Sequence, residues 1–200
     1  QNYLEVSDIV NGRMKQKRPL SEDEMDSILS PIKALNEKKF EYYFEFNDRQ
    51  IINYKVLSKR LCLSWIVNAH EDNFILGRKK NIETINYPNL IFSIKGNSLS
   101  VLCFKGKFNG LKTKVYKAPF PNIYEDNTMC FGNINVSSLF SKNLNITMKN
   151  FEDSFFNTGF NALESQNRSK SNTFELLKSL VKTKQKFPDK ELILIKEKIK

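Results

Sequence analysis

Two prolines within three residues, Pro119 and Pro121, place the strongest constraint on how this 200-residue chain can fold. A basic, alternating, strand-like run leads up to them and ends at Ala118. Proline fixes its own φ angle, lacks an N–H donor and favours extended geometry at the residue before it. The chain is therefore expected to leave its sheet at Ala118 and to continue as a stiff, irregular loop.

This loop carries two side chains with the chemistry of acyl transfer. Asn122 follows the second proline directly, and Cys130 comes eight residues later. A thiolate can attack a carbonyl carbon, and an amide donor held beside it can stabilise the oxyanion that forms. The loop therefore predicts Cys130 as a nucleophile and Asn122 as an oxyanion donor. For Cys130, the alternative is a structural thiol, which is the commoner role of a single cysteine. For Asn122, the alternative is a structural amide that only supports a turn.

The same residues resemble a known enzyme motif. Pro121-Asn122 followed by Cys130 resembles the His-Pro-Asn motif of ubiquitin-conjugating enzymes, in which the active cysteine also lies eight residues after the asparagine. The longer strings A-P-F-P-N-I-Y-E-D-N-T-M-C-F-G at 118–132 and F-E-D-S-F-F-N at 151–157 are similar to prokaryotic ubiquitin-conjugating-enzyme family D. That family is also described as protein B of the plasmid-associated PRTRC system.

The resemblance covers roughly Pro19 to Phe160 and includes one departure from the motif. Phe120 stands where the motif has its histidine. In ubiquitin-conjugating enzymes that histidine chiefly supports the loop. Phe120 is therefore expected to pack its ring under the loop and to replace polar support by apolar contact.

The resemblance implies both a fold and a function. The fold would be α+β, with an N-terminal helix, an antiparallel meander sheet, an active-cysteine loop and C-terminal helices. The chain would accept a ubiquitin-like protein from a ThiF-like activating enzyme as a thioester on Cys130, and pass it to an amine or another acceptor. A JAB-type metallopeptidase would be a further component of the same system.

Two other functions remain open at this stage. The first is a non-catalytic module that keeps the fold and only binds a ubiquitin-like or plasmid-maintenance partner. The second is a basic nucleic-acid-binding protein, because 32 Lys and Arg against 22 Asp and Glu give a net charge of +10. Such an excess attracts anionic partners. The chain lacks the sequence signatures of the common RNA and DNA readers, so nucleic acid is not the expected partner.

Hydrophobic periodicity predicts the order of the elements. Ser21 and Glu24 have the spacing of a capping box, which predicts a helix with an apolar face reaching Leu35 and an interruption at Pro31. From residue 40 the period changes to two, which predicts a series of strands. These strands are expected at 40–46, 51–57, 61–67, 74–76, 90–94 and 99–104, with a last one at Val115. A helical turn is expected at 136–140, and helices at 151–160 and 174–181, with a polar linker at 164–172.

Three segments follow from this order. Residues 1–38 form an N-terminal segment with a helix, 39–163 a core resembling a ubiquitin-conjugating enzyme, and 164–200 a basic helical extension. No apolar run is long enough to span a bilayer, so a membrane partner is not expected.

The remaining titratable residues exclude several other kinds of site. The three cysteines are too far apart for a disulfide framework or a zinc motif, which favours the reducing cytoplasm. Cys62 and Cys103 lie in apolar strand patterns and are expected in the core. The single histidine, His70, falls in a predicted turn, so no histidine base is expected for a hydrolase. Neither a glycine-rich phosphate loop nor metal-ligand spacing is present, so no cofactor or metal is predicted.

Overall fold

The structure is a computed structural model of the whole chain, which forms two compact units, Gln1–Glu41 and Tyr42–Lys200. The residues that it describes are 5–7, 9–10, 13–14, 17–27, 42–44, 50–58, 60–76, 82–160 and 167–195.

The first unit contains two short strand pairs and the start of a helix. The strands are β1 (Glu5–Val6), β2 (Ile9–Val10), β3 (Arg13–Met14) and β4 (Arg18–Pro19), with β1 antiparallel to β4 and β2 antiparallel to β3.

The predicted capping box is present at the start of this helix, which covers residues 22–27. The Glu24 N–H donates to Ser21 Oγ at 3.3 Å, and the Ser21 N–H donates to Glu24 Oε2 at 3.0 Å. Each side chain thus satisfies a backbone donor of the other residue. The rest of the predicted helix, with its interruption at Pro31, lies outside the described residues.

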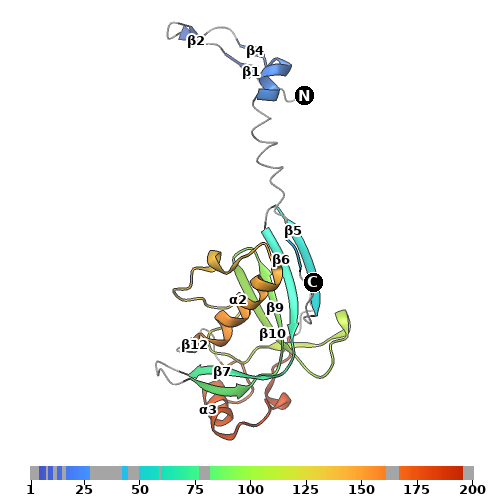
Figure 1. Cartoon of the computed structure of the whole chain (residues 1–200), viewed down its shortest axis with the longest axis vertical. Helices are drawn as coiled ribbons and strands as arrows, with labels where there is room; N and C mark the ends of the chain where they lie inside the picture. Colours follow the sequence, from blue (N-terminus) through green and yellow to red (C-terminus); the bar gives the residue numbers. More distant parts are fainter. Residues whose placement is uncertain are drawn as a thin grey trace. The chain divides into compact units, whose positions relative to one another are not determined.

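The second unit has the predicted α+β fold (Figure 1). Its strands are β5 (Ile51–Leu57), β6 (Arg60–Val67), β7 (Glu71–Leu76), β8 (Glu83–Asn86), β9 (Asn89–Lys95), β10 (Ser98–Phe104), β11 (Val115–Lys117) and β12 (Gly159–Phe160). Its helices are α2 (Leu144–Phe156) and α3 (Thr173–Thr183), with 3-10 turns η1 (Gly110–Lys112), η2 (Val136–Leu139) and η3 (Asp189–Glu191).

The large sheet is antiparallel, with the strand order β11-β10-β9-β6-β5. The meander is interrupted because β6 pairs with β9, while β7 and β8 form a separate three-stranded sheet with β12. In that smaller sheet β12 runs parallel to β7. The short strand β8 was not predicted, because Ile85 is its one buried apolar residue and it shows no alternation.

The main core lies between one face of the large sheet and α2, which crosses that face in Figure 1. The Trp65 ring stacks on Phe92 at a centroid distance of 5.4 Å, and its Nε1 donates to Glu152 Oε1 at 2.7 Å. Phe92 in turn meets Phe155 of α2 edge to face at 5.3 Å. The second face carries a smaller cluster: Ile66, Ile91, Phe104 and Val115.

Helix α2 begins seven residues before the predicted start at 151. The Asn143 side chain accepts a hydrogen bond from the Asn145 N–H at 2.9 Å and caps the helix. Leu144 and Met148 extend the buried stripe of Phe151 by about two earlier turns. The predicted start of this helix at residue 151 was therefore wrong.

Residues 167–195 pack within the second unit. Helix α3 lies against β8, and the segment after it runs beside β11. The Lys117 N–H donates to Ile193 O at 2.9 Å, and the Ile195 N–H donates to Val115 O at 3.0 Å. The C-terminal segment thus covers the outer edge of the large sheet.

The two cysteines expected in the core are buried there. Cys62 lies in β6, and Cys103 in β10 is fully enclosed. Burial raises the pKa of the Cys103 thiol, which keeps it protonated and unreactive. Within the described ranges, no helix is both long and apolar enough to cross a membrane.

Candidate active site

The cysteine loop, residues 118–132, is a hairpin. Ile123 and Met129 form an antiparallel bridge, flanked by the Cys130 N–H donating to Asn122 O and the Tyr124 N–H donating to Thr128 O, both at 2.8 Å. Asn122 and Cys130 therefore stand directly opposite each other. Opposed residues in an antiparallel pair extend their side chains from the same face. The eight-residue step from Asn122 to Cys130 therefore spans this hairpin from one limb to the facing position on the other.

The tip of the hairpin depends on a turn that asparagine favours. The Asn127 N–H donates to Tyr124 O at 2.9 Å, and Asn127 has a φ of 68°. Asparagine is one of the few residues other than glycine that tolerate this left-handed region. The E-D-N string thus closes the turn by local chemistry.

The hairpin is also joined to the large sheet. The Met129 N–H donates to Leu99 O at 2.7 Å, and the Val101 N–H donates to Asn127 O at 3.0 Å. The returning limb of the hairpin therefore pairs with the first half of β10, whereas β11 pairs with its second half. These bonds give Cys130 a rigid backbone support.

The Asn122 side chain is buried, and its polar atoms lack partners among the described residues. It is 6% exposed, and neither Nδ2 nor Oδ1 has a hydrogen-bond partner among the described residues. A buried amide in this state costs about 1–3 kcal/mol of stability. Cys130, on the facing limb, is partly exposed and free. The site therefore combines a partly exposed cysteine with a buried amide that lacks a hydrogen-bond partner within the described part of the chain.

Phe120 supports the loop as predicted. Its side chain is fully buried, and its ring lies 5.2 Å from Tyr87, 5.4 Å from Phe155 and 5.7 Å from Phe160, measured between centroids. Apolar contact thus supports the loop at the position where the motif has its histidine.

The acidic residues of the turn have structural partners. Asp126 Oδ1 accepts from Thr128 Oγ1 at 2.6 Å and from the Thr128 N–H at 2.9 Å, and these bonds lower the pKa of Asp126. Glu125 pairs with Lys117. Asp126 is therefore placed as a turn residue, and the charge of Glu125 is partly neutralised.

Arg168 is the residue of this site that sequence reasoning missed. Its side chain is fully buried and donates to Ala118 O at 2.7 Å, Tyr124 O at 2.8 Å and Asn127 Oδ1 at 2.6 Å. Glu125 Oε2 lies 3.9 Å from its Nη1. The polar composition around it predicts a linker, but residues 167–172 are part of the folded unit. No sequence signal identifies the acceptors, because they lie more than 40 positions away.

A family model described as prokaryotic E2 family D matches residues 30–195. The chain belongs to prokaryotic E2 family D. The match runs past the predicted end at Phe160 and includes both Arg168 and α3. No curated protein and no solved structure gives a significant match.

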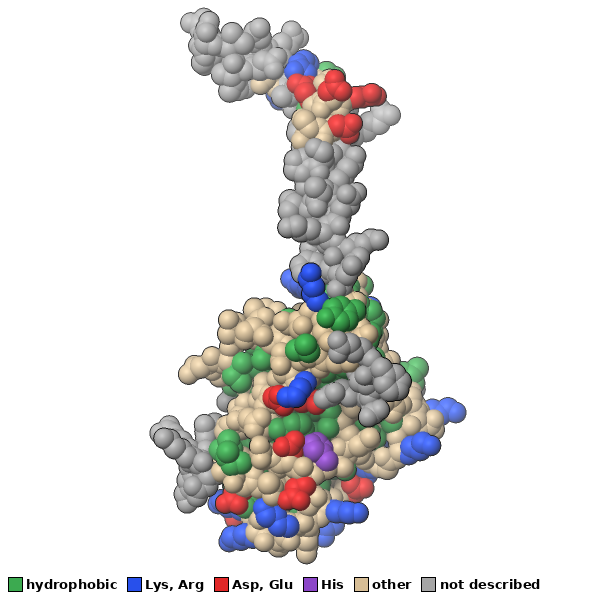
Figure 2. Space-filling view, in the orientation of Figure 1, with side chains coloured by type: hydrophobic (Ala, Val, Ile, Leu, Met, Phe, Trp, Pro, Cys, Tyr) green, Lys and Arg blue, Asp and Glu red, His purple; other side chains and the backbone are tan. Residues whose placement is uncertain are grey.

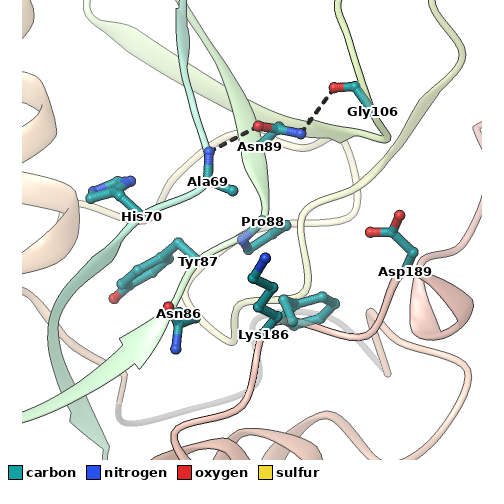
Figure 3. Close-up of a pocket in the computed structure, with 10 residues that line it drawn as sticks. Ala69, His70, Asn86, Tyr87, Pro88, Asn89, Gly106, Lys186 and Asp189 are labelled. Atoms are coloured by element: carbon teal, nitrogen blue, oxygen red, sulfur yellow. Dashed lines mark hydrogen bonds between the residues drawn. The ribbon is translucent and has the colours of Figure 1, made fainter.

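This family D chain has a cavity of about 310 Å³ away from the cysteine loop, and His70 is one of the residues that line it (Figure 3). Asn89 bridges two of its walls by accepting from the Ala69 N–H at 2.8 Å and donating to Gly106 O at 3.2 Å. His70 Nε2 lies 3.3 Å from Asp72 Oδ2. His70 therefore has local partners in its turn, and neither Asn122 nor Cys130 lines this cavity.

The net positive charge does not gather into one patch on the face shown in Figure 2, where basic side chains of the second unit lie among acidic ones. Among the residues that the structure describes, no group of three or more His, Cys, Asp and Glu side chains could hold a metal ion.

Proposed function

We propose that this chain is a conjugating enzyme that carries a ubiquitin-like protein as a thioester on Cys130. The observation that carries the proposal is the buried amide of Asn122, which has no hydrogen-bond partner among the described residues and lies directly across the hairpin from the partly exposed Cys130. An amide that is buried without partners is costly in a resting protein. The cost is explained if the missing partner is an oxyanion that forms only during the reaction.

The proposed reaction has two acyl-transfer steps. In the first, the Cys130 thiolate attacks the carbonyl carbon of a thioester on the activating enzyme. A new carbon–sulfur bond forms, the old one breaks, and the thiolate of the activating enzyme leaves. In the second, an acceptor amine attacks the same carbonyl carbon. An amide bond forms, the amine loses a proton, and the Cys130 thiolate is released.

The Asn122 Nδ2 would donate to the oxyanion in the tetrahedral species of both steps. A donor that binds mainly this species lowers the barrier without tightening ground-state binding. One such donor typically contributes about 2.7–4 kcal/mol, or roughly a hundred- to thousandfold in rate. The backbone bonds of the hairpin would hold the amide in position beforehand.

The proposed partners are a ThiF-like activating enzyme and a ubiquitin-like protein. This chain would not consume ATP itself, because activation of the acyl group would occur on the partner. A JAB-type metallopeptidase would act on the modifier rather than on this chain. These partners are proposed from the family and from the chemistry that a thioester donor requires.

The test is formation of an adduct that thiol reductants remove. The chain would be incubated with ATP and with any ubiquitin-like protein and ThiF-like activating enzyme encoded beside its gene, and resolved on non-reducing gels. Wild type and Cys62→Ala should form the adduct, and Cys130→Ala should not. Cys130→Ser should form an oxygen ester more slowly, and this ester should resist thiol reductants. A reductant-sensitive adduct on Cys130→Ala would refute the assignment.

A second candidate function is binding without catalysis. It is favoured by a groove of about 550 Å³ on the second face of the large sheet, lined in part by Ile52, Leu57, Ile91 and Leu111. Leu57 and Leu111 are exposed. Binding of the ubiquitin-like protein by wild type without any thioester would favour this function over the first.

A further inference from the structure

We propose that Arg168 is a positioning residue for acyl transfer, which holds the cysteine loop so that Asn122 faces the carbonyl carried by Cys130. This inference rests on the proposed function and goes beyond it, since Arg168 lies outside the motif that predicts the site.

Three side-chain hydrogen bonds of Arg168 join the two parts of the loop that enclose Asn122. Nε binds Ala118 O just before the prolines, whereas Nη1 and Nη2 bind Tyr124 O and Asn127 Oδ1 in the turn. Asn122 lies between these attachment points along the chain. The guanidinium is planar and rigid, so the three bonds fix the base of the loop relative to its turn.

The same bonds stabilise the left-handed backbone of Asn127, because Nη2 binds the side chain of that residue at 2.6 Å. The Asn127 carbonyl is the acceptor that joins the hairpin to Val101 of β10. Arg168 therefore acts on the turn that closes the hairpin and on its attachment to the sheet.

Arg168 is itself held in position by the start of α3. The Arg168 N–H donates to Thr173 Oγ1 at 2.9 Å, and the Ser169 N–H donates to the same oxygen at 3.2 Å. Thr173 is fully buried. Burial lowers the pKa of the Arg168 guanidinium, but arginine remains charged at neutral pH. Because Arg168 is fixed to the start of α3, its guanidinium restricts the movement of the cysteine loop that it binds.

The catalytic consequence is alignment of the amide with the reacting carbonyl. A small misplacement of a positioning group can slow a reaction roughly a hundredfold. Without Arg168, Ala118 O and Tyr124 O lose their charged donor, and the loop can shift relative to α3. Asn122 would then no longer be held where the oxyanion forms.

The test compares Arg168→Met, Arg168→Lys and Asn127→Gly with wild type. Arg168→Met removes these three side-chain bonds, and Arg168→Lys keeps the positive charge but not the planar, forked guanidinium. Asn127→Gly removes one acceptor and keeps a residue that tolerates positive φ. The matched control is Lys170→Met, which removes an exposed positive charge two residues away.

The main measurement is single-turnover discharge of the purified Cys130 thioester to free lysine, at a temperature below the melting transition of every variant. Only folded, loaded protein is counted, so a loss of stability alone leaves this rate constant unchanged. Arg168→Met is expected to discharge roughly tenfold to a hundredfold more slowly than wild type. The rate constant of Asn127→Gly should fall by a smaller factor, and that of Lys170→Met should equal the wild-type value. Affinity for the ubiquitin-like protein should be the same for all. Discharge by Arg168→Met at the wild-type rate would overturn the proposal. If that variant does not fold, discharge by Asn127→Gly at the wild-type rate would overturn it instead.

A second measurement needs no partner and separates this proposal from the proposed function. Hydrogen exchange of the Cys130 N–H, which binds Asn122 O, should be faster in Arg168→Met than in Lys170→Met. If wild type forms no thioester, the proposed function fails, and with it the catalytic role of Arg168. Faster exchange then still supports its role as the anchor of the loop, whereas unchanged exchange removes that role as well.

Discussion

Replacing Asn122 by leucine should make the protein more stable and less active at the same time. Leucine has the same branching as asparagine and carries two methyl groups, which are somewhat larger, in place of the polar atoms of the amide. The amide that it replaces is 6% exposed and has no hydrogen-bond partner among the described residues. Removing such a group is expected to raise the free energy of unfolding by about 1–3 kcal/mol.

The activity should change in the opposite direction. Loss of the oxyanion donor is expected to slow single-turnover discharge of the thioester to lysine by roughly a hundred- to thousandfold. Binding of the ubiquitin-like protein should stay near the wild-type affinity, because the amide acts on the tetrahedral species. Stability would be measured by urea unfolding, followed by the fluorescence of Trp65, which is fully buried in the core.

Asn143 provides a matched control, since it is also a buried asparagine but its side chain caps α2. Asn143→Leu should lower the free energy of unfolding by roughly 0.5–2 kcal/mol and leave the discharge rate constant unchanged. The reasoning is refuted if Asn122→Leu is destabilised like Asn143→Leu and discharges at the wild-type rate. That result would make Asn122 a structural amide of the turn.

The remaining predictions concern stability, pH and thiol reactivity. Phe120→Ala should lower the free energy of unfolding by about 3–5 kcal/mol in urea melts, because the ring is fully buried; a loss below about 1 kcal/mol would contradict its role under the loop. A hydrogen bond from Arg18 lowers the pKa of Glu24 from 4.5 to about 2, so its contribution to the first unit should be complete above pH 4.5 and lost as the pH falls through about 2. An NMR titration midpoint near 4.5 would argue against this. Iodoacetamide should modify Cys130 in the native protein and Cys103 only after unfolding, as followed by peptide mass spectrometry; equal native labelling would contradict the burial of Cys103.

Local chemistry accounts for the features that the sequence predicts well. The prolines end the strand, and the step from Asn122 to Cys130 closes a hairpin whose turn is formed by neighbouring residues. The capping box of Ser21 and Glu24 needs only residues three positions apart. Such signals are readable because the interacting groups lie close together along the chain. The predicted resemblance to family D was carried by the same short strings, and the family model matches residues 30–195.

Other features depend on partners that are distant in the sequence. Strand β8 and the separate sheet of β7, β8 and β12 were not predicted, because β8 lacks alternation and β12 pairs with β7 over a long distance in the sequence. Helix α2 was predicted to start too late, because its N-cap lies outside the strongest apolar stripe.

Arg168 shows the difference most clearly. The sequence by itself determined where the loop begins, which residues close it and which thiol it carries. Only the tertiary structure decided that a charged side chain from a polar segment supports the loop, 50, 44 and 41 positions from its three acceptors. The physical reason is that a buried charge is stable only where acceptors surround it, and those acceptors are brought together by the packing of α3 and the sheet.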